Sequence, residues 1–330
     1  METRRLGRTG RDVGAVGLGT WQLGGDWGDV SEDDALAVLR AALDEGVTLL
    51  DTADVYGDGR SERLIGRFLA DLPEDDRPLV ATKAGRRADP FEAAQYTAEN
   101  LRAWVARSLA NLRTERLDLL QLHCPPPPVY GDDAVYDALD ALVDEGLLAA
   151  YGVSVETVEE AMTALARPRL ATLQIILNAF RRKPLDAVLP AAAAAGVGVL
   201  ARVPLASGLL TGTYDASTTF AETDHRHFNR DGAAFDVGET FSGVPFELGL
   251  RAAAEVGVVA AARGVPTAQL ALRWVLDQPG VTAAIPGART PEQVRGNAAA
   301  ARLAPLTEDE LAAVERVYDE ELRALVHPRW

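Results

Sequence analysis

Residues 31–51 read SEDDALAVLRAALDEGVTLLD and contain one complete helix-to-strand unit. Ser31, followed by acidic residues, is a typical helix N-cap. The apolar residues after it share one helical face: Ala35, Leu36, Val38, Leu39, Ala42 and Leu43. Gly46 ends this predicted helix, and the apolar run 47–50 then reads as a buried strand that stops at Asp51. The stretch therefore predicts a helix packed beside a strand of a parallel sheet.

The same unit recurs along the chain, so that eight strand-like apolar runs can be counted. They lie at about residues 15–19, 47–51, 79–83, 117–122, 149–153, 172–177, 197–203 and 281–285. Eight such units favour an α/β fold of the (β/α)8 TIM barrel type over an open sheet.

Three further segments complete the predicted architecture. Residues 4–13 predict an N-terminal hairpin that closes the base of the barrel, and residues 247–277 predict two helices before the last strand. Residues 291–302 and 308–322 predict extra C-terminal helices. Because no linker or second core is apparent, we expect residues 1–330 to form a single domain.

The composition is that of a globular, enzyme-sized protein, with 48% hydrophobic and 25% charged residues. A net charge of −16 argues against a nucleic-acid partner, because binding a phosphate backbone needs a basic surface. The arginines are dispersed, and the most apolar stretch, residues 188–203, is too short to span a bilayer. The lone Cys124 excludes an internal disulfide, and residues 1–12 lack the apolar core of a secretory signal. We expect a cytoplasmic protein without membrane partners, whose oligomeric state the sequence leaves open.

Polar residues close three of the predicted strands. Asp51, Lys83 and His123 each follow an apolar run, and Tyr56 lies in the loop after Asp51. Barrel enzymes carry their catalytic groups at the carboxyl ends of strands. We expect Lys83 to lower the pKa of Tyr56, and Asp51 to keep Lys83 charged. His123 would orient a substrate oxygen, so that the four groups together can protonate a carbonyl. Taken singly, each residue is more often structural; their coincidence at adjacent strand ends favours catalysis.

The stretch DTADVYG at residues 51–57 resembles the signature of the aldo-keto reductase family. Other motifs follow in that family's order: Gly17-Leu18-Gly19-Thr20, Ala81-Thr82-Lys83, Leu120-Gln121-Leu122-His123, Tyr151-Gly152-Val153-Ser154 and Ile285-Pro286-Gly287. The resemblance implies a (β/α)8 barrel that binds NADP (NADPH) across its strand ends, without a Rossmann domain. It also implies that Asp51, Tyr56, Lys83 and His123 are a catalytic tetrad for interconverting a small-molecule carbonyl and its alcohol.

By the same resemblance, the cofactor-binding residues are Gly19, Thr20, Trp21, Asp51, Ser154, Val155, Gln174, Arg202, Val203, Pro204, Leu205, Ser207, Gly208, Ile285, Gly287, Ala288, Arg289, Gln293 and Asn297. The expected substrate contacts are Trp21, Tyr56 and His123. Arg289 suits the 2′-phosphate of NADP, because a guanidinium binds phosphate oxygens in a fork. No metal site is predicted, since the histidines lack carboxylate or cysteine partners at metal-ligand spacing.

Two positions depart from the family pattern. Val155 stands where relatives often have asparagine, and Arg202 stands where many have an aromatic residue that stacks on the nicotinamide. A planar guanidinium can also lie flat on a ring, but it adds positive charge beside the cofactor. This charge would alter the cofactor preference or favour an anionic or polyol substrate.

Two other functions remain open from the sequence. A barrel lyase would use Lys83 as a Schiff-base amine, which requires a neutral lysine. A regulatory subunit of the same fold would bind the cofactor with little turnover. The substrate is not encoded in a recognisable motif: Trp21 and Trp27, with four phenylalanines of the segment 206–246, either wall an apolar pocket or anchor that segment.

Overall fold

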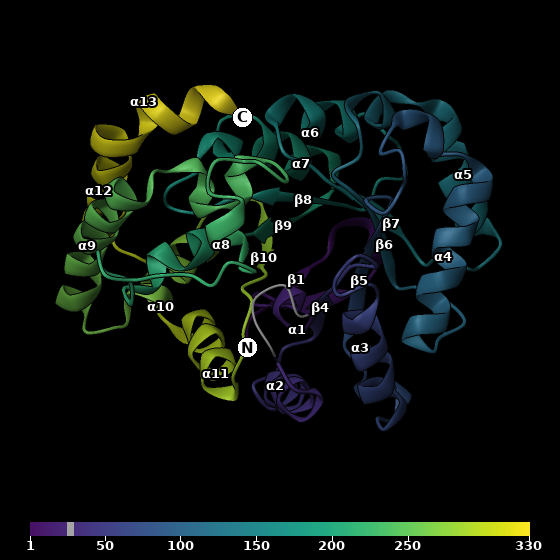
Figure 1. Ribbon diagram of the computed structural model, residues 1–330, viewed down its shortest axis with the longest axis horizontal. Coiled ribbons are helices and arrows are strands. Elements are labelled where there is room, and N and C mark those ends of the chain that lie inside the picture. Colours follow the sequence, from purple (N-terminus) through teal and green to yellow (C-terminus); the bar gives the residue numbers. More distant parts are fainter. Residues whose placement is uncertain (25–29) are drawn as a thin grey trace.

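The computed structural model describes residues 1–24 and 30–330, and Trp27 lies outside the described residues. Within these ranges, eight strands pair in parallel and in chain order to form one curved sheet (Figure 1). They are β3 (Leu18–Gly19), β4 (Leu49–Asp51), β5 (Leu79–Ala84), β6 (Leu119–His123), β7 (Tyr151–Ser154), β8 (Thr172–Ile176), β9 (Gly198–Arg202) and β10 (Val281–Ala284). All of the predicted strands are present, and the sheet is consistent with a (β/α)8 fold.

The two edges of the sheet are joined by isolated parallel bridges. Val16 pairs with Ala284, and Gly19 pairs with Gly287. The backbone nitrogen of Gly17 donates to the carbonyl of Ala284 at 2.9 Å. The first and last strands therefore lie side by side.

The predicted hairpin is also confirmed, as β1 (Thr3–Arg5) paired antiparallel with β2 (Asp12–Gly14). Leu6 and Val13 are fully buried among side chains from five of the strands, including Leu49, Leu79 and Leu119. The hairpin thus packs against the amino ends of the strands, opposite the ends that carry the polar residues.

Apart from two short ones at the carboxyl ends of the strands, the α-helices lie mostly around the outer side of the sheet (Figure 1). They are α1 (Trp21–Gly24), α2 (Glu32–Asp44), α3 (Arg60–Ala70), α4 (Ala98–Leu112), α5 (Asp133–Asp144), α6 (Val158–Leu165), α7 (Val188–Ala195), α8 (His225–Phe228), α9 (Phe246–Arg263), α10 (Thr267–Leu276), α11 (Pro291–Ala299), α12 (Glu308–Val317) and α13 (Arg323–Val326). Helix α2 starts as predicted, because the Ser31 hydroxyl accepts a hydrogen bond from the backbone nitrogen of Asp34 at 3.1 Å. In the described part of the chain, no helix combines the length and apolarity that crossing a membrane requires.

The segment 206–246 uses its aromatic residues in both of the ways that the sequence left open. Phe220 and Phe241 pack on each other at 5.8 Å between ring centroids, and both contact Phe246 of α9. Phe228 and Phe235 instead line a cavity at the carboxyl ends of the strands. The first pair anchors the segment, whereas the second forms part of a pocket wall.

Candidate active site

Side-chain alternation along the strands brings the polar residues together. In β5, Leu79 and Ala81 belong to the cluster enclosed by the sheet, so Lys83 points to the same side. The same alternation from Leu49 directs Asp51 inward, and from Leu119 it directs Gln121 and His123 inward. The predicted catalytic groups thus lie in one layer above the apolar interior.

Lys83 is the centre of this group. Its Nζ atom donates to Asp51 Oδ2 at 2.6 Å, to the carbonyl of Thr52 at 3.0 Å and to Tyr56 Oη at 3.3 Å. The Tyr56 ring meets the His123 ring edge-on, with centroids 5.9 Å apart. The structure therefore brings all four predicted residues together.

Close backbone packing fixes the position of Tyr56. Gly57 has a φ of +58°, and a Cβ at this residue would collide with the carbonyl of Gly24. A side chain at Gly24 would meet the backbone of Tyr56. Two glycines thus allow α1 to press the tyrosine loop against the strand ends.

The protonation states follow from burial and from these contacts. Burial lowers the pKa of Lys83, but the negative charge of Asp51 and the contact with Tyr56 outweigh it, so the pKa lies above its ordinary value. Burial raises the pKa of Tyr56, and the opposing charge of Lys83 does not cancel that effect. Our expectation of a net lowered pKa for Tyr56 is therefore wrong. At neutral pH the site holds an ammonium and an intact phenol.

His123 is held neutral. Its pKa lies well below the ordinary value because of burial and the charges of Arg86, Lys83 and Arg202. Among the described residues, its buried Nδ1 atom has no hydrogen-bond partner. A neutral imidazole keeps one N–H group with which to contact a substrate oxygen.

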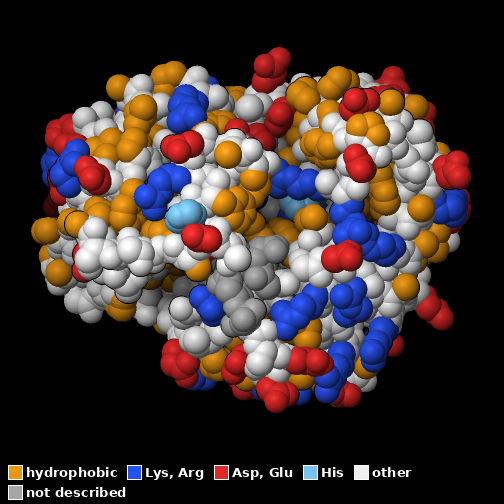
Figure 2. Space-filling view, viewed as in Figure 1, with side chains coloured by type: hydrophobic (Ala, Val, Ile, Leu, Met, Phe, Trp, Pro, Cys, Tyr) orange, Lys and Arg blue, Asp and Glu red, His pale blue; other side chains and the backbone are white. Residues whose placement is uncertain are grey.

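A cavity of about 870 Å³ opens over this layer. Figure 2 shows a hollow near the middle of the face of the molecule that it draws, with Lys and Arg side chains beside the hollow. Tyr56, His123 and every predicted cofactor-binding residue except Val155 line the cavity. Val155 lies in the core, and Lys83 does not line the cavity itself but contacts Tyr56 and Asp51, which do. Residues that the sequence did not single out also line it, among them Gln22, Arg86, Arg226, Glu239 and Gln269.

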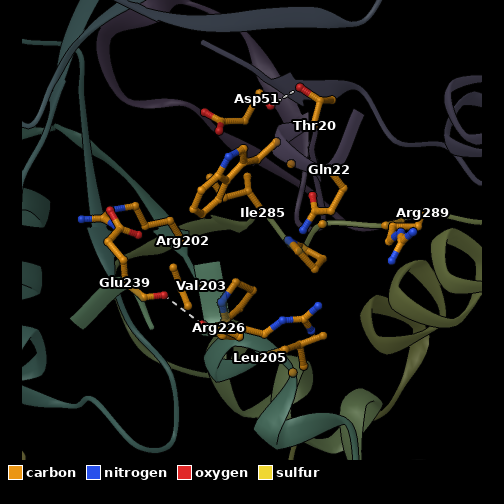
Figure 3. Close-up of a pocket in the computed structure, with 18 of the residues that line it drawn as sticks. Thr20, Gln22, Asp51, Arg202, Val203, Leu205, Arg226, Glu239, Ile285 and Arg289 are labelled. Carbon is orange, nitrogen blue, oxygen red and sulfur yellow. Dashed lines mark hydrogen bonds and ion pairs between the residues drawn. The ribbon is translucent and has the colours of Figure 1, made fainter. Parts of the chain in front are cut away.

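The cavity carries different groups on its opposite sides. In Figure 3, Asp51, Arg202 and Glu239 lie away from Arg289, which is on the opposite side. Arg289 is exposed, and its guanidinium has no ion pair with any residue of the described ranges. Near Asp51, the Gln174 amide donates to Asp51 Oδ1 at 2.7 Å, which leaves its oxygen as an acceptor. Ser154 pairs with Gln174 in adjacent strands, so their side chains share one wall.

From its departure from the family pattern, we expected Arg202 to add an uncompensated positive charge beside the cofactor. In the structure, its guanidinium is instead paired with two carboxylates. Its Nη1 atom is 2.6 Å from Glu239 Oε1, and its Nη2 atom is 2.9 Å from Glu156 Oε2. Nη2 also donates to the carbonyl of Val155 at 3.0 Å. The unbalanced positive charge that we expected is thus compensated. Glu156 and Glu239 come from separate loops and were not predicted, although a buried arginine itself signals that carboxylates must be near.

Cys124, Glu156 and Glu239 place ligand atoms within 4.8 Å of one another, which is a spacing that could hold a metal ion. Both carboxylates, however, are already paired with Arg202. Burial raises the pKa of the Cys124 thiol to about 12, so a thiolate ligand is disfavoured. We interpret the group as an ion-pair cluster.

Parallel strands that place ionisable side chains beside a cavity at their carboxyl ends are typical of (β/α)8 enzymes. The sequence model of the aldo/keto reductase family matches residues 15–319, and the chain belongs to this family, as its motifs indicated. The aldo-keto reductase YhdN of Bacillus subtilis is 35% identical over 299 residues, which cover 89% of this chain and 87% of YhdN.

Solved structures agree with this assignment. The glycerol dehydrogenase AKR11B4 from Gluconobacter oxydans superposes with a TM-score of 0.81 and 34% identity, covering 99% of this chain and 98% of its own. An aldo-keto reductase from Klebsiella pneumoniae, solved in complex with NADPH, has a TM-score of 0.71 and 26% identity, with 96% of each chain covered.

Proposed function

We propose that this chain is an NADP-dependent oxidoreductase that reduces an aldehyde or ketone to an alcohol, or catalyses the reverse reaction, on a single closed (β/α)8 domain. The observation that carries the proposal is the position of Lys83 Nζ, 2.6 Å from Asp51 Oδ2 and 3.3 Å from Tyr56 Oη beneath the cavity. A small-molecule substrate suits the size of that cavity. With one cysteine in the chain, a reducing compartment such as the cytoplasm remains our expectation.

The lining of the cavity fits a nicotinamide dinucleotide. Ser154 and Gln174 offer a hydroxyl donor and an amide acceptor for a carboxamide, and the exposed Arg289 suits a phosphate. Between these positions, beside Gly287, lies a buried acceptor, Gln22 Oε1, that has no hydrogen-bond partner among residues 1–24 and 30–330. When bound, NADPH supplies the hydride that reduces the carbonyl carbon.

The protein's own contribution is the proton. The phenol of Tyr56 donates its proton to the carbonyl oxygen, and the ammonium of Lys83 stabilises the phenolate that remains. Asp51 keeps that ammonium charged. The neutral His123 donates a hydrogen bond to the same oxygen and orients it. In alcohol oxidation the phenolate accepts the proton instead.

The other two functions have less support. A Schiff-base lyase needs a neutral amine, whereas Lys83 pairs with Asp51 and has a raised pKa. A regulatory subunit would retain the cavity but not need the aligned proton donor. We therefore favour the enzyme, and the regulatory subunit remains the alternative that the following experiment separates.

The test is a Tyr56→Phe variant, with Tyr96→Phe as the control because Tyr96 is a buried tyrosine that does not line the cavity. We expect Tyr56→Phe to lower kcat by about 10²- to 10⁴-fold across a panel of aldehydes and sugars, because a general acid is lost. A fluorescence titration should give nearly the same affinity for NADPH. Normal turnover by Tyr56→Phe would refute the role of Tyr56. Tight NADPH binding without turnover by the natural sequence would support the regulatory alternative.

A further inference from the structure

One wall of the cavity carries charged side chains that the proposed proton transfer does not use. Arg86 follows β5, and Glu239 belongs to the short helix η7 (Val237–Glu239) of the long segment 206–246. Both line the cavity together with Tyr56 and His123. Among the charges that lower the His123 pKa, that of Arg86 has the largest effect. The pair therefore lies at the end where a substrate carbonyl would react.

The two arginines of this wall, Arg202 and Arg86, differ in how many hydrogen bonds they make. Both terminal nitrogens of Arg202 are engaged, by Glu156, Glu239 and the carbonyl of Val155, as described above. Arg86, by contrast, lies 4.0 Å from Glu156 Oε1 and 3.9 Å from Glu239 Oε1, beyond hydrogen-bond distance. Its charge is partly balanced, but its N–H groups are not saturated.

The guanidinium of Arg86 is available to a ligand. No residue in the described ranges accepts a hydrogen bond from it, and 27% of its side chain is exposed. It packs over the ring of Phe235, 5.8 Å from the centroid, which holds it at the cavity wall. Within the same ranges, the second carboxylate oxygen of Glu239 accepts no hydrogen bond. A donor and an acceptor thus face the cavity side by side.

We propose that Arg86 and Glu239 form a substrate subsite that binds a hydroxyl group next to the reacting carbonyl. The enzyme then prefers hydroxy-aldehydes, hydroxy-ketones and the matching polyols. A hydroxyl can accept a hydrogen bond from the guanidinium and donate one to the carboxylate at the same time. The inference rests on the proposed function, because it assigns the substrate class of that same site.

The charge balance of the wall selects against other substrates. Two guanidinium groups, Arg86 and Arg202, face two carboxylates, Glu156 and Glu239, so the wall is formally neutral. A substrate anion would be repelled by the carboxylates about as strongly as it is attracted by the arginines. An apolar substrate would leave Arg86 and Glu239 desolvated and unpaired, which is costly.

The experiment compares two aldehydes that differ in hydroxylation, glyceraldehyde and propanal, with NADPH as the reductant. The readout is the ratio of their kcat/KM values. We expect a ratio well above one for the natural sequence, and a fall of about tenfold or more in Arg86→Met and in Glu239→Gln, because a hydrogen bond to a charged group is lost. Arg87→Met is the matched control: Arg87 pairs with Asp58 outside the cavity, and its removal should leave the ratio unchanged.

The outcomes separate this inference from the proposed function. If the natural sequence reduces neither aldehyde, the proposed function fails. If it reduces both but Arg86→Met and Glu239→Gln, shown by NADPH titration and circular dichroism to be folded, keep the ratio, the subsite is refuted. A preference for glyoxylate over both aldehydes that is lost in Arg86→Met would also overturn it, because the wall would then be an anion site.

Discussion

Tyr56 is a half-buried phenol at the cavity whose pKa is raised, despite an ammonium within hydrogen-bond distance. The direction matters for the proposed chemistry. A proton donor must hold its proton at working pH, and a lowered pKa would leave part of the tyrosine as phenolate. Lys83 is then best understood as a group that stabilises the phenolate after transfer, and not as one that ionises Tyr56 beforehand.

Asp54, two residues before Tyr56, gives a pH prediction at the same scale. It is fully buried, both carboxylate oxygens lack hydrogen-bond partners among the described residues, and Arg107 lies 4.0 Å away. Burial and the charge of Glu62 raise its pKa to about 7 from 3.8. The folded state thus favours the protonated form. The stability that Asp54 contributes is complete below about pH 4 and is lost as the pH rises to about 7.

We expect Asp54→Asn to remove the loss of folding stability that the buried carboxyl causes as the pH rises. Urea unfolding at pH 4.5 and pH 8 should show the variant gaining stability relative to the natural sequence at the higher pH, by a few kcal/mol (roughly 1.4 kcal/mol per pKa unit). Asp137→Asn, an exposed change on α5, is the control, and its free energy of unfolding should differ from that of the natural sequence by the same amount at both pH values. A difference for Asp54→Asn that does not change with pH would contradict the assignment.

At the scale of elements, η7 is held in place by Trp330. The Trp330 indole donates from Nε1 to Asp236 Oδ1 at 3.0 Å, and Asp236 in turn accepts from the backbone of Gly238 at 2.7 Å. The Arg181 guanidinium stacks on the indole at 4.1 Å. Trp330 therefore positions the turn that carries Glu239 to the cavity.

Trp330→Ala should lower the free energy of unfolding by about 3–5 kcal/mol, since a buried aromatic side chain is removed. It should also raise KM for the carbonyl substrate, because η7 loses its support. Trp330→Phe keeps a stacked ring but loses the N–H group, and intermediate values are expected. Urea unfolding and steady-state kinetics measure the two effects. A destabilised Trp330→Ala enzyme with unchanged KM would show that η7 is held by other contacts.

Local patterns explain which elements could be predicted. The strands and the hairpin are visible in the sequence because burial imposes apolar runs, and glycines mark their turns. Asp51, Lys83 and His123 could be found since they end such runs. Arg86, Glu156 and Glu239 could not, because they come from three separate loops that only tertiary packing brings together. The sequence also cannot show that burial of Tyr56 outweighs the charge of Lys83.

For the molecule as a whole, cofactor binding should increase the stability of the folded state. The proposed cofactor site draws on both edges of the sheet, from Gly19 to Arg289, so a bound dinucleotide would tie them together. A ligand at 1,000 times its Kd stabilises the folded state by about 4 kcal/mol. For a chain of this size, each kcal/mol raises Tm by roughly 2 °C. NADPH should therefore raise Tm by several degrees.

Arg289→Ala tests whether this stabilisation depends on the 2′-phosphate. In the natural sequence, NADPH should raise Tm more than an equal concentration of NADH, because only NADPH offers the extra phosphate to the exposed guanidinium. The variant should lose that difference while keeping the response to NADH. Arg295→Ala is the matched control, since Arg295 lies on α11, pairs with Glu292 and does not line the cavity. If NADPH and NADH raise the Tm of the natural sequence equally, Arg289 does not recognise the 2′-phosphate, and any cofactor preference comes from other residues.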